Sequence, residues 1–503
     1  MEHTMRKQMK KAVIILFWLI VWQIAAVCID NHILLVGPVQ VLNAFAHNVI
    51  QPDFFKIVIH SFARIGLGFF LALFAGLMLG TMGYRFRIVE EILAPAIQAV
   101  KSIPVASFVV LLLIWFGSQR LSFFISFLIV FPNVYVNMIA GLKSADIKLL
   151  EMAQVFGIGR AKRFFYIYRP AVMPYLNSCL KISLGMSWKS GVAAEVIGLP
   201  DYSMGERLYM SKIYLDTAGL LAWTFTIILV SFLFEKAVLK LIKIFADWKP
   251  YPRTYSRIRT ERCNVRGEKV KYGKMRYHPA DTGTDMYRKA DDKTGQETKK
   301  DMIQVQKVDK FYTTLPVLQN FNMSLVKGQR YLLMAPSGGG KTTLLKILTG
   351  LENVNQGEIT GMPEHIGMVF QEDRLCEEYD VICNIMLGMT GWLSGKSEAV
   401  LCHEVAGIIE YVRKEAVRIL PAECLTKQVN ELSGGMRRRA ALLRAVMSFS
   451  DMLILDEPFA GLDEENRLRC AQYLMENLRG RTLLVTTHRE DDVELLRGIK
   501  ITL

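Results

Sequence analysis

Long runs of apolar residues dominate the first half of the chain and are rarer in the rest of it. About six of these runs approach the roughly 20 residues that a helix needs to cross a bilayer. They cover residues 12–29, 61–83, 103–117, 121–142, 175–198 and 220–242. Pro104 interrupts the start of the third run, which is also the shortest. We therefore predict an all-α transmembrane domain of about six helices over residues 1–250.

A polar stretch separates this apolar half from a region of ordinary soluble composition. Residues 251–301 are rich in Arg, Lys, Asp, Thr and Gly and have almost no apolar periodicity, which is typical of a flexible linker. A chain of 503 residues also exceeds what one hydrophobic core normally organises. The sequence therefore predicts a second, globular domain over residues 302–503.

The basic residues indicate how the apolar half is oriented. The chain has 61 Lys and Arg against 47 Asp and Glu, a formal net charge of +14. The basic residues cluster before the first run, at Arg85 and Arg87, between residues 143 and 169, and after the last run. Because Lys and Arg accumulate on the cytoplasmic side, we predict a multi-pass protein of the cell membrane with a cytoplasmic N-terminus and a cytoplasmic second domain. The lipid bilayer then accounts for much of the charge, and no nucleic acid partner is predicted.

The segment between the fourth and fifth predicted spans carries a recurring pattern. It reads Glu151-Met152-Ala153-Gln154-Val155-Phe156-Gly157 and continues to Ile167-Tyr168-Arg169-Pro170. This resembles the EAA loop of binding-protein-dependent importer permeases, with Met152 in place of an alanine and Arg169 in place of a leucine. The resemblance implies a short helix that docks on an ATPase, with Glu151, Ala153 and Gly157 as coupling residues. An amphipathic connector punctuated by Gly and Pro is the alternative.

The apolar half as a whole, from about residue 37 to residue 250, is similar to permeases of the nitrate, sulfonate and taurine importer family. Its fifth predicted span contains Lys189 and Glu195, which are costly in a bilayer and need a reason to be there. Both are candidates for lining a translocation path, where a lysine would suit an anionic substrate. Snorkelling, or pairing with another helix, explains Lys189 equally well.

A glycine-rich loop in the second domain indicates nucleotide binding. It reads Ala335-Pro336-Ser337-Gly338-Gly339-Gly340-Lys341-Thr342-Thr343, and it lies between a predicted strand and an apolar helix, as in a P-loop of an α/β domain. Backbone N–H groups of such a loop converge on phosphate oxygens, Lys341 reaches the terminal phosphates, and Thr342 supplies a hydroxyl to Mg²⁺. We therefore predict ATP and Mg²⁺ as cofactors. Ala335 replaces the usual first glycine, which would strain a turn that needs a positive φ.

An acidic pair supports the same chemistry. The apolar run at residues 452–455 ends in Asp456-Glu457, the arrangement expected beside a P-loop. Asp456 is expected to act on Mg²⁺, and Glu457 to polarise the attacking water.

The whole of residues 302–503 resembles the ATPase of ABC transporters. Leu432-Ser433-Gly434-Gly435-Met436 is similar to the signature motif, which in this family contacts ATP held by the opposite subunit. Gly461-Leu462-Asp463 resembles the D-loop, His488 the switch histidine, and Gln371 the Q-loop residue. Tyr312 matches the aromatic that stacks on adenine.

The resemblance implies catalytic roles for Glu457, His488 and Gln371, and metal binding by Thr342, Gln371 and Asp456. It implies nucleotide binding by Tyr312, Ser337, Gly338, Gly339, Gly340, Lys341, Thr342, Thr343, Ser433, Gly434, Gly435 and Asp463. Two further departures from the family pattern are Arg438, where glutamine is common, and Arg489, where aspartate is common.

These features predict an ATP-hydrolysing importer in which two copies of the chain form the transporter, with a heterodimer left open. An external substrate-binding protein is the implied partner. The expected substrate is a small solute, an anion such as nitrate, a sulfonate or taurine, with another small solute such as a vitamin precursor left open. An exporter has the same order of domains, and a membrane-anchored regulatory ATPase is a third interpretation. The short spans and the coupling loop favour the importer.

Overall fold

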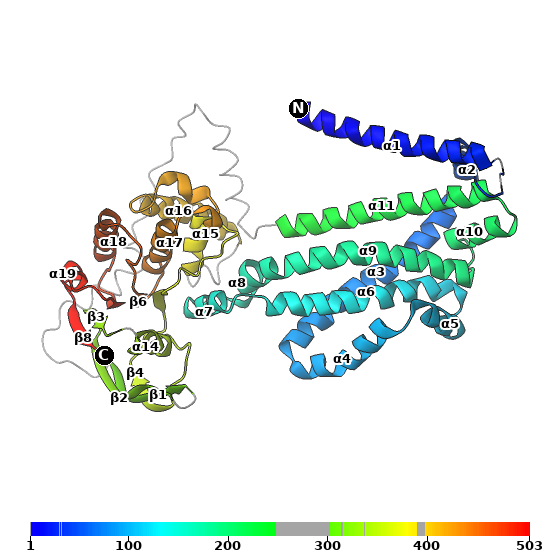
Figure 1. The fold of residues 1–503 in the computed structure, drawn as a ribbon. Coiled ribbons are helices and arrows are strands. Elements are labelled where there is room, and N and C mark those ends of the chain that lie inside the picture. Colours follow the sequence, from blue (N-terminus) through cyan, green and yellow to red (C-terminus); the bar gives the residue numbers. More distant parts are fainter. Residues whose placement is uncertain are drawn as a thin grey trace. The chain divides into compact units, whose positions relative to one another are not determined.

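The computed structural model describes residues 2–29, 31, 33–247, 302–312, 315–336, 338–389 and 398–503 (Figure 1). The chain forms two units, one of Met1–Ser144 with Ala171–Lys249 and one of Ala145–Pro170 with Pro250–Leu503. This differs from the predicted division, which assigned residues 145–170 to the first domain. The predicted linker at residues 251–301 lies outside the described residues.

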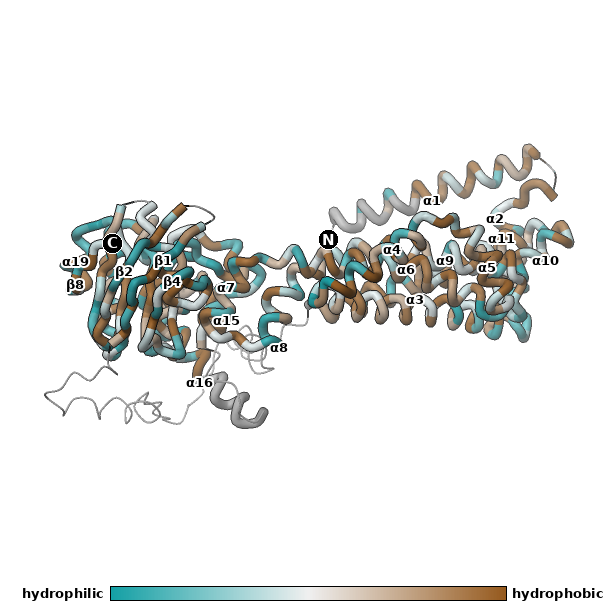
Figure 2. Tube along the Cα trace, turned by 90° about the horizontal axis from the view of Figure 1, so that it is seen from below, coloured by the Kyte–Doolittle hydropathy of each residue, from teal (hydrophilic) through white to brown (hydrophobic). Residues whose placement is uncertain are grey.

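The first unit is built from helices. Its described residues form α1 (Glu2–Ile29), α2 (Pro38–Ile50), α3 (Phe54–Arg85), α4 (Arg87–Ser102), α5 (Val105–Phe116), α6 (Ser118–Lys143), α9 (Arg169–Gly198), α10 (Met204–Ile213) and α11 (Thr217–Asp247). Hydrophobic residues, brown in Figure 2, run along these helices. Large apolar side chains such as Phe74 of α3 and Phe232 of α11 are exposed in the isolated chain, as expected for surfaces that face lipid.

All six apolar runs are helical, but fewer of them have the length and composition of a span. Among the described helices, three are long and apolar enough to cross a membrane: Phe54–Arg85, Ser118–Lys143 and Thr217–Phe245. The third predicted span is instead the short helix α5, joined to α4 at a bend of 106°, and this pair counts as a fourth span if it is one broken helix. The bend falls at Pro104, which precedes α5 and disfavours a helical conformation for the residue before it.

Helices α3 and α6 pack closely because glycines of α3 face α6. A Cβ atom at Gly68 would lie 2.3 Å from the carbonyl oxygen of Phe123, and one at Gly76 would lie 2.7 Å from Val134 Cγ1. Small residues of this kind allow helix backbones to approach each other in a membrane, where van der Waals contacts replace the hydrophobic effect as the driving force.

The second unit contains two sheets. The smaller is antiparallel, in the order β2-β1-β4, with β1 (Met302–Tyr312), β2 (Leu315–Val326) and β4 (Gln356–Thr360). The larger is parallel, in the order β5-β6-β7-β3-β8, with β3 (Arg330–Met334), β5 (Ile366–Val369), β6 (Met452–Asp456), β7 (Thr482–Thr486) and β8 (Ile499–Thr502). Every residue of β6 and β7 is buried, which is the pattern of a parallel sheet covered on both faces.

Helices complete the second unit. They are α14 (Lys341–Leu348), α15 (Val381–Gly388), α16 (Glu398–Ala416), α17 (Gly434–Val446), α18 (Glu464–Glu476) and α19 (Asp491–Leu496), with short 3-10 helices at Ala422–Thr426 and Val429–Glu431. The second unit also includes the segment that follows α6 and precedes α9 in the sequence. This segment forms α7 (Ile147–Val155), α8 (Arg160–Arg163) and a π-helical turn at Phe164–Tyr168.

The residues predicted to bind and hydrolyse ATP lie at one edge of the parallel sheet. The P-loop follows β3, Gln371 follows β5, Asp456 ends β6, and His488 follows β7. Because the carboxyl ends of parallel strands meet at the same edge, segments far apart in the sequence lie together there. The register agrees, since Asp456 on β6 pairs with Thr486 on β7.

Candidate functional site

The loop between β3 and α14 has the backbone of a P-loop. Gly338 and Gly340 have φ values of +83° and +84°, which favour glycine. A Cβ atom at Gly340 would also lie 3.1 Å from the carbonyl oxygen of Val317. Ala335 is not among the described residues with positive φ, so the strain considered for its replacement of glycine does not arise. Ser337 lies outside the described residues.

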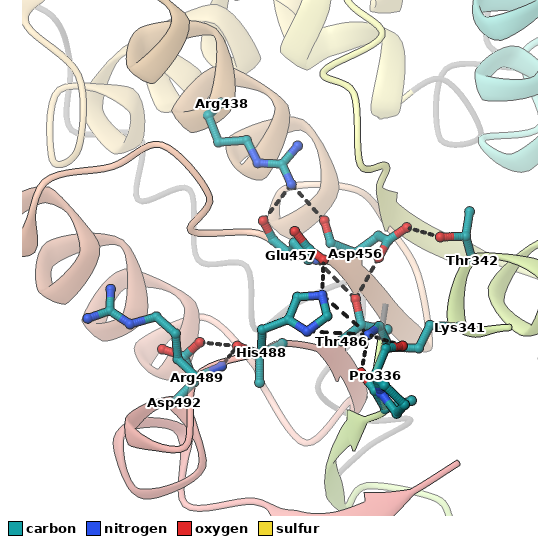
Figure 3. A network of polar contacts seen from close by, with 12 residues as sticks. Pro336, Lys341, Thr342, Arg438, Asp456, Glu457, Thr486, His488, Arg489 and Asp492 are labelled. Atoms are coloured by element: carbon teal, nitrogen blue, oxygen red, sulfur yellow. Dashed lines mark hydrogen bonds and ion pairs between the residues drawn. The ribbon is translucent and has the colours of Figure 1, made fainter. Parts of the chain in front are cut away.

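Lys341, the first residue of α14, is held at the mouth of this loop. Its side chain is buried, and Nζ donates to the carbonyl oxygens of Ala335 and Pro336. Nζ also lies 3.3 Å from Nε2 and 3.5 Å from Nδ1 of His488 (Figure 3). The ammonium group is therefore held by carbonyl oxygens of the loop, and the backbone N–H groups of a loop of this kind can bind an anion.

Asp456, at the end of β6, faces the hydroxyl of the residue that follows Lys341. Thr486 Oγ1 donates to Asp456 Oδ1 at 2.6 Å, and Thr342 Oγ1 donates to Asp456 Oδ2 at 3.4 Å. Burial raises the pKa of the Asp456 carboxyl, while the hydrogen bond from Thr486 lowers it. The Asp456 and Thr342 oxygens fit Mg²⁺, because this ion prefers hard oxygen ligands and one or two protein groups beside phosphate and water.

Glu457 follows Asp456 and has an unusual backbone. Its φ of +48° lies in the left-handed region, which is sparsely populated for non-glycine residues. Its N–H group donates to Thr486 through the carbonyl oxygen at 3.2 Å and Oγ1 at 3.1 Å. Its Oε1 lies 2.9 Å from Nε2 of His488 (Figure 3). The structure thus brings Lys341, Asp456, Glu457 and His488 together.

Models of two families match the two halves of the chain. Residues 68–241 match the inner membrane component of binding-protein-dependent transport systems. Residues 318–460 match the ABC transporter family.

Individual relatives are ATP-binding proteins. The chain is 34% identical over 207 residues to Nod factor export ATP-binding protein I of Cupriavidus pinatubonensis, covering 39% of this chain and 61% of that protein. It is 32% identical over 207 residues to the sulfate/thiosulfate import ATP-binding protein CysA of Neisseria meningitidis serogroup A, covering 38% of this chain and 56% of that protein. It is 33% identical over 196 residues to the aliphatic sulfonates import ATP-binding protein SsuB 1 of Pseudomonas fluorescens, covering 39% of this chain and 70% of that protein. The chain belongs to the ABC transporter family.

The alignments leave part of the first relatives uncovered, since the chain spans 61% and 56% of the length of the first two named above. The family nevertheless frames the remaining predicted residues. The predicted signature segment, residues 432–436, leads into α17, where Ser433 is the N-cap and its hydroxyl accepts from Met436 N–H at 3.4 Å. Ser433 and Gly434 are exposed, and Gly435 is half-buried. Asp463 is the N-cap residue of α18, and its Oδ1 accepts from Asn466 at 2.6 Å.

Tyr312 is the last residue of β1, and Gln371 lies just after β5. Tyr312 is 42% exposed, its hydroxyl donates to Glu352, and Lys310 Nζ lies 5.2 Å from the ring centroid. Thr343, in the first turn of α14, is half-buried. Gln371 is exposed, and its carbonyl oxygen accepts from Arg438 at 3.2 Å. The nucleotide, metal and catalytic roles of these residues stay predictions.

Sequence analysis alone does not predict what two polar residues of the site do. Thr486 links the Asp456 carboxylate to the Glu457 N–H group, and its position as the last residue of a buried strand is the signal that could have found it. Arg438 was noted only as a departure from the family, yet it is buried and its guanidinium contacts five groups. The other departure, Arg489, is exposed and lies 3.6 Å from Glu464.

The predicted coupling helix packs on the ATPase within the second unit. Glu151 on α7 forms an ion pair with Arg374, in which Oε2 and Nη1 are 2.6 Å apart and the side chains are 29% and 11% exposed. Gln154 Nε2 donates to the carbonyl oxygen of Gly350 at 3.1 Å. The coupling role itself stays a prediction, but α7 lies against the loop that follows β5.

Two other predicted coupling residues shape this loop rather than form ion pairs. Ala153 is fully buried, and its carbonyl oxygen accepts from Ile158 N–H at 2.9 Å. Gly157 has a φ of +61°, and a Cβ atom there would meet no atom within 4 Å. Glycine is therefore favoured at residue 157 by its backbone conformation and not by crowding.

Arg169, which replaces a leucine of the EAA pattern, itself belongs to the second unit and has a specific partner within it. It is buried, and Nη2 donates to the Tyr379 hydroxyl at 3.2 Å. The Tyr379 hydroxyl in turn donates to the carbonyl oxygen of Phe165 at 2.9 Å. The departure in the loop is thus matched by a polar residue on the ATPase.

The two ionisable residues of α9 differ in their surroundings. Glu195 is fully buried, and its Oε2 accepts from Ser61 Oγ at 2.8 Å and from Gly205 N–H at 3.3 Å. Glu195 therefore ties α9 to α3 and α10. The side chain of Lys189 is exposed. A path-lining role for either residue stays a prediction.

Proposed function

We propose that the chain is an ATP-driven importer of a small anion, in which hydrolysis at the parallel-sheet edge moves a membrane permease. The observation that carries this proposal is the seating of α7 on the loop after β5, with the Glu151–Arg374 ion pair at its centre. The loop connects two apolar helices of the part of the chain that matches inner membrane components of binding-protein-dependent systems. Helix α7 is continuous in sequence with the permease helices and packs on the ATPase. The permease and the ATPase can therefore share one conformational equilibrium.

The nucleotide chemistry follows from the arrangement of the site. The P-loop N–H groups and Lys341 would bind the ATP phosphates, and Thr342 and Asp456 would hold Mg²⁺. An ion held there would supply positive charge to offset that of the phosphates. Glu457 orients and deprotonates the attacking water, and His488 holds the carboxylate in place through the 2.9 Å contact.

We propose that two copies of the chain form the transporter. The exposed start of α17 supports this, since Ser433 and Gly434 are free to meet a nucleotide bound to another copy. Backbone N–H groups at a helix N-terminus bind phosphate well. An external binding protein would deliver the substrate, as the family model of the membrane half implies.

We propose an oxyanion as the substrate, of the class of sulfonate, taurine or nitrate. Two relatives named for sulfate/thiosulfate and aliphatic sulfonate import support this class. The exposed Lys189 on α9 supplies a positive charge of the kind that an anion path would use.

Lys341→Ala should weaken ATP binding. A hydrogen bond to a charged group contributes about 1.5–3 kcal/mol, so affinity should fall by roughly ten-fold or more. Titration of the full-length protein with ATP in Mg²⁺ buffer measures this. Lys500→Ala is the control, because Lys500 is an exposed lysine paired with Glu490. Equal ATP affinity for wild type and Lys341→Ala would contradict the P-loop assignment.

Transport by the reconstituted full-length chain tests the whole proposal. Proteoliposomes with ATP inside and with the binding protein and labelled taurine, alkanesulfonate or nitrate outside should accumulate one of these anions and hydrolyse ATP faster than without the binding protein. ATP-dependent movement in the opposite direction would instead identify an exporter. ATP hydrolysis with no movement in either direction would identify a regulatory ATPase.

A further inference from the structure

Arg438, on the first turns of α17, bridges the ends of two parallel strands. Its Nη2 donates to the carbonyl oxygens of Asp456 and Glu457, both at 2.6 Å, just after β6 (Figure 3). Its Nη1 donates to the carbonyl oxygens of Phe370 at 2.6 Å and Gln371 at 3.2 Å, just after β5. One guanidinium group therefore joins the catalytic segment to the loop that holds Gln371.

This arrangement is a weak source of stability. Arg438 is 4% exposed, so its charge has left water, and the nearest carboxylate is Asp373, with Oδ1 3.2 Å from Nη1. Its Nε has no hydrogen-bond partner among the described residues. A buried charge with incomplete hydrogen bonding often costs more than it returns in stability. The geometry therefore favours a role in function.

The segment that Arg438 holds includes the strained residue of the site. Glu457 has a positive φ, which persists only where the surroundings fix it. Thr486 holds the N–H group of Glu457, and Arg438 holds its carbonyl oxygen. The two contacts flank the Glu457 Cα atom and so fix the backbone from which its carboxylate extends.

The other segment that Arg438 holds leads to the coupling helix. Asp373 accepts from Arg438, and the next residue, Arg374, forms the ion pair with Glu151. Arg444, also on α17 and fully buried, donates to the carbonyl oxygens of Asp373 and Arg374 at 3.0 and 2.7 Å. Its guanidinium carbon lies 5.2 Å from the centroid of the Phe156 ring in the coupling loop. The coupling helix α7 therefore contacts a loop that Arg438 ties to Glu457.

We propose that Arg438 is a positioning residue that aligns Glu457 for water activation and links that alignment to the docking of α7. The link to α7 rests on the proposed function, whereas the alignment of Glu457 concerns ATP hydrolysis alone. Glutamine has a single amide with two N–H donors, against five in arginine, so it cannot donate to all four carbonyl oxygens that Arg438 contacts. The arginine therefore gives this chain more hydrogen bonds between the two strand ends than the common glutamine can make.

Arg438→Gln in the full-length protein tests the alignment. We expect kcat for basal ATP hydrolysis to fall by about 10- to 100-fold, because small misplacement of a catalytic group has effects of this size. KM and the measured affinity for ATP should stay within about two-fold of wild type, because the P-loop is untouched. Arg438→Lys should show the same pattern, since it keeps the charge beside Asp373 but lacks the planar fork.

Arg481→Gln is the matched control. Arg481 is a buried arginine that donates to backbone carbonyl groups of Val446, Ser448, Asn477 and Leu478. Its loss should lower the melting temperature while kcat is retained. If both Arg438 variants keep the wild-type kcat, or raise KM at unchanged kcat, the alignment is refuted.

Stimulation by the binding protein tests the link to α7. The ratio of stimulated to basal hydrolysis should fall in Arg438→Gln and stay unchanged in Arg481→Gln. An unchanged ratio in Arg438→Gln overturns the link. A wild-type protein that shows neither stimulation nor uptake contradicts the proposed import function instead, and the basal kcat of the Arg438 variants still decides the alignment.

Discussion

Replacing Glu457 with glutamine should reduce ATP hydrolysis by about 10²–10⁴-fold and leave ATP binding intact, because the change removes the general base and preserves its size. The structure gives a reason to expect a well-folded variant. A glutamine retains the backbone bonds to Thr486 and Arg438 and still reaches His488, which lies 2.9 Å from the present carboxylate. Phosphate release by the purified full-length protein measures the loss, and ATP titration measures the binding.

Glu465→Gln is the control for this experiment. Glu465 is an exposed glutamate at the start of α18 that pairs with Arg469 at 2.8 Å. Its replacement should leave both hydrolysis and binding at wild-type values. Full turnover by Glu457→Gln would show that another group activates the water, and the assignment of the site edge would have to change.

Much of the nucleotide site could be predicted because its residues occur in short segments with local signatures. The glycine-rich loop before Lys341 follows the apolar strand β3, and the acidic pair Asp456-Glu457 lies at the end of the apolar strand β6, so each motif indicates both chemistry and position. Parallel pairing then brings β3, β6 and β7 together. The concern over Ala335 could not be resolved in the same way, because φ at one residue depends on the whole turn.

The residues that connect these segments could not be predicted. Arg438 acts through carbonyl oxygens, which every residue has, so no sequence pattern marks its partners. No sequence pattern marks the role of Thr486 either, because a threonine that ends a buried strand is common. Sequence analysis finds the groups that do chemistry more readily than those that hold them.

The membrane half shows a different limit. Apolar runs located the helices, but their lengths depend on breaks that composition does not measure. Pro104 separates α4 from α5, and the 106° bend leaves α5 with 12 residues. Glu195 was singled out for its charge, while its partners Ser61 and Gly205 lie on other helices and were not foreseen.

Charge reversal at the coupling helix should separate ATP binding from transport. Glu151→Arg would place two guanidinium groups where an ion pair of 2.6 Å now lies, in a contact with side chains only 29% and 11% exposed. Because like charges in a partly buried contact repel, α7 should detach from the loop after β5. Stimulation by the binding protein and substrate uptake should both fall by roughly 5- to 150-fold, the range typical of coupling between sites. ATP affinity should be unchanged, since Lys341 and the P-loop are not altered.

The double variant Glu151→Arg with Arg374→Glu makes the prediction specific, because it restores opposite charges in swapped positions. It should recover part of the stimulation. Recovery should be incomplete, since Arg374 also lies over the Phe370 ring with 4.0 Å to the centroid, which a glutamate cannot replace.

Lys148→Glu is the control, because Lys148 pairs with Glu372 on the same surface but both side chains are 53% exposed, and such pairs contribute little. Stimulated hydrolysis and uptake in proteoliposomes give the readout. Normal coupling in Glu151→Arg would show that α7 does not transmit the ATPase movement, and the importer proposal would lose the observation that carries it.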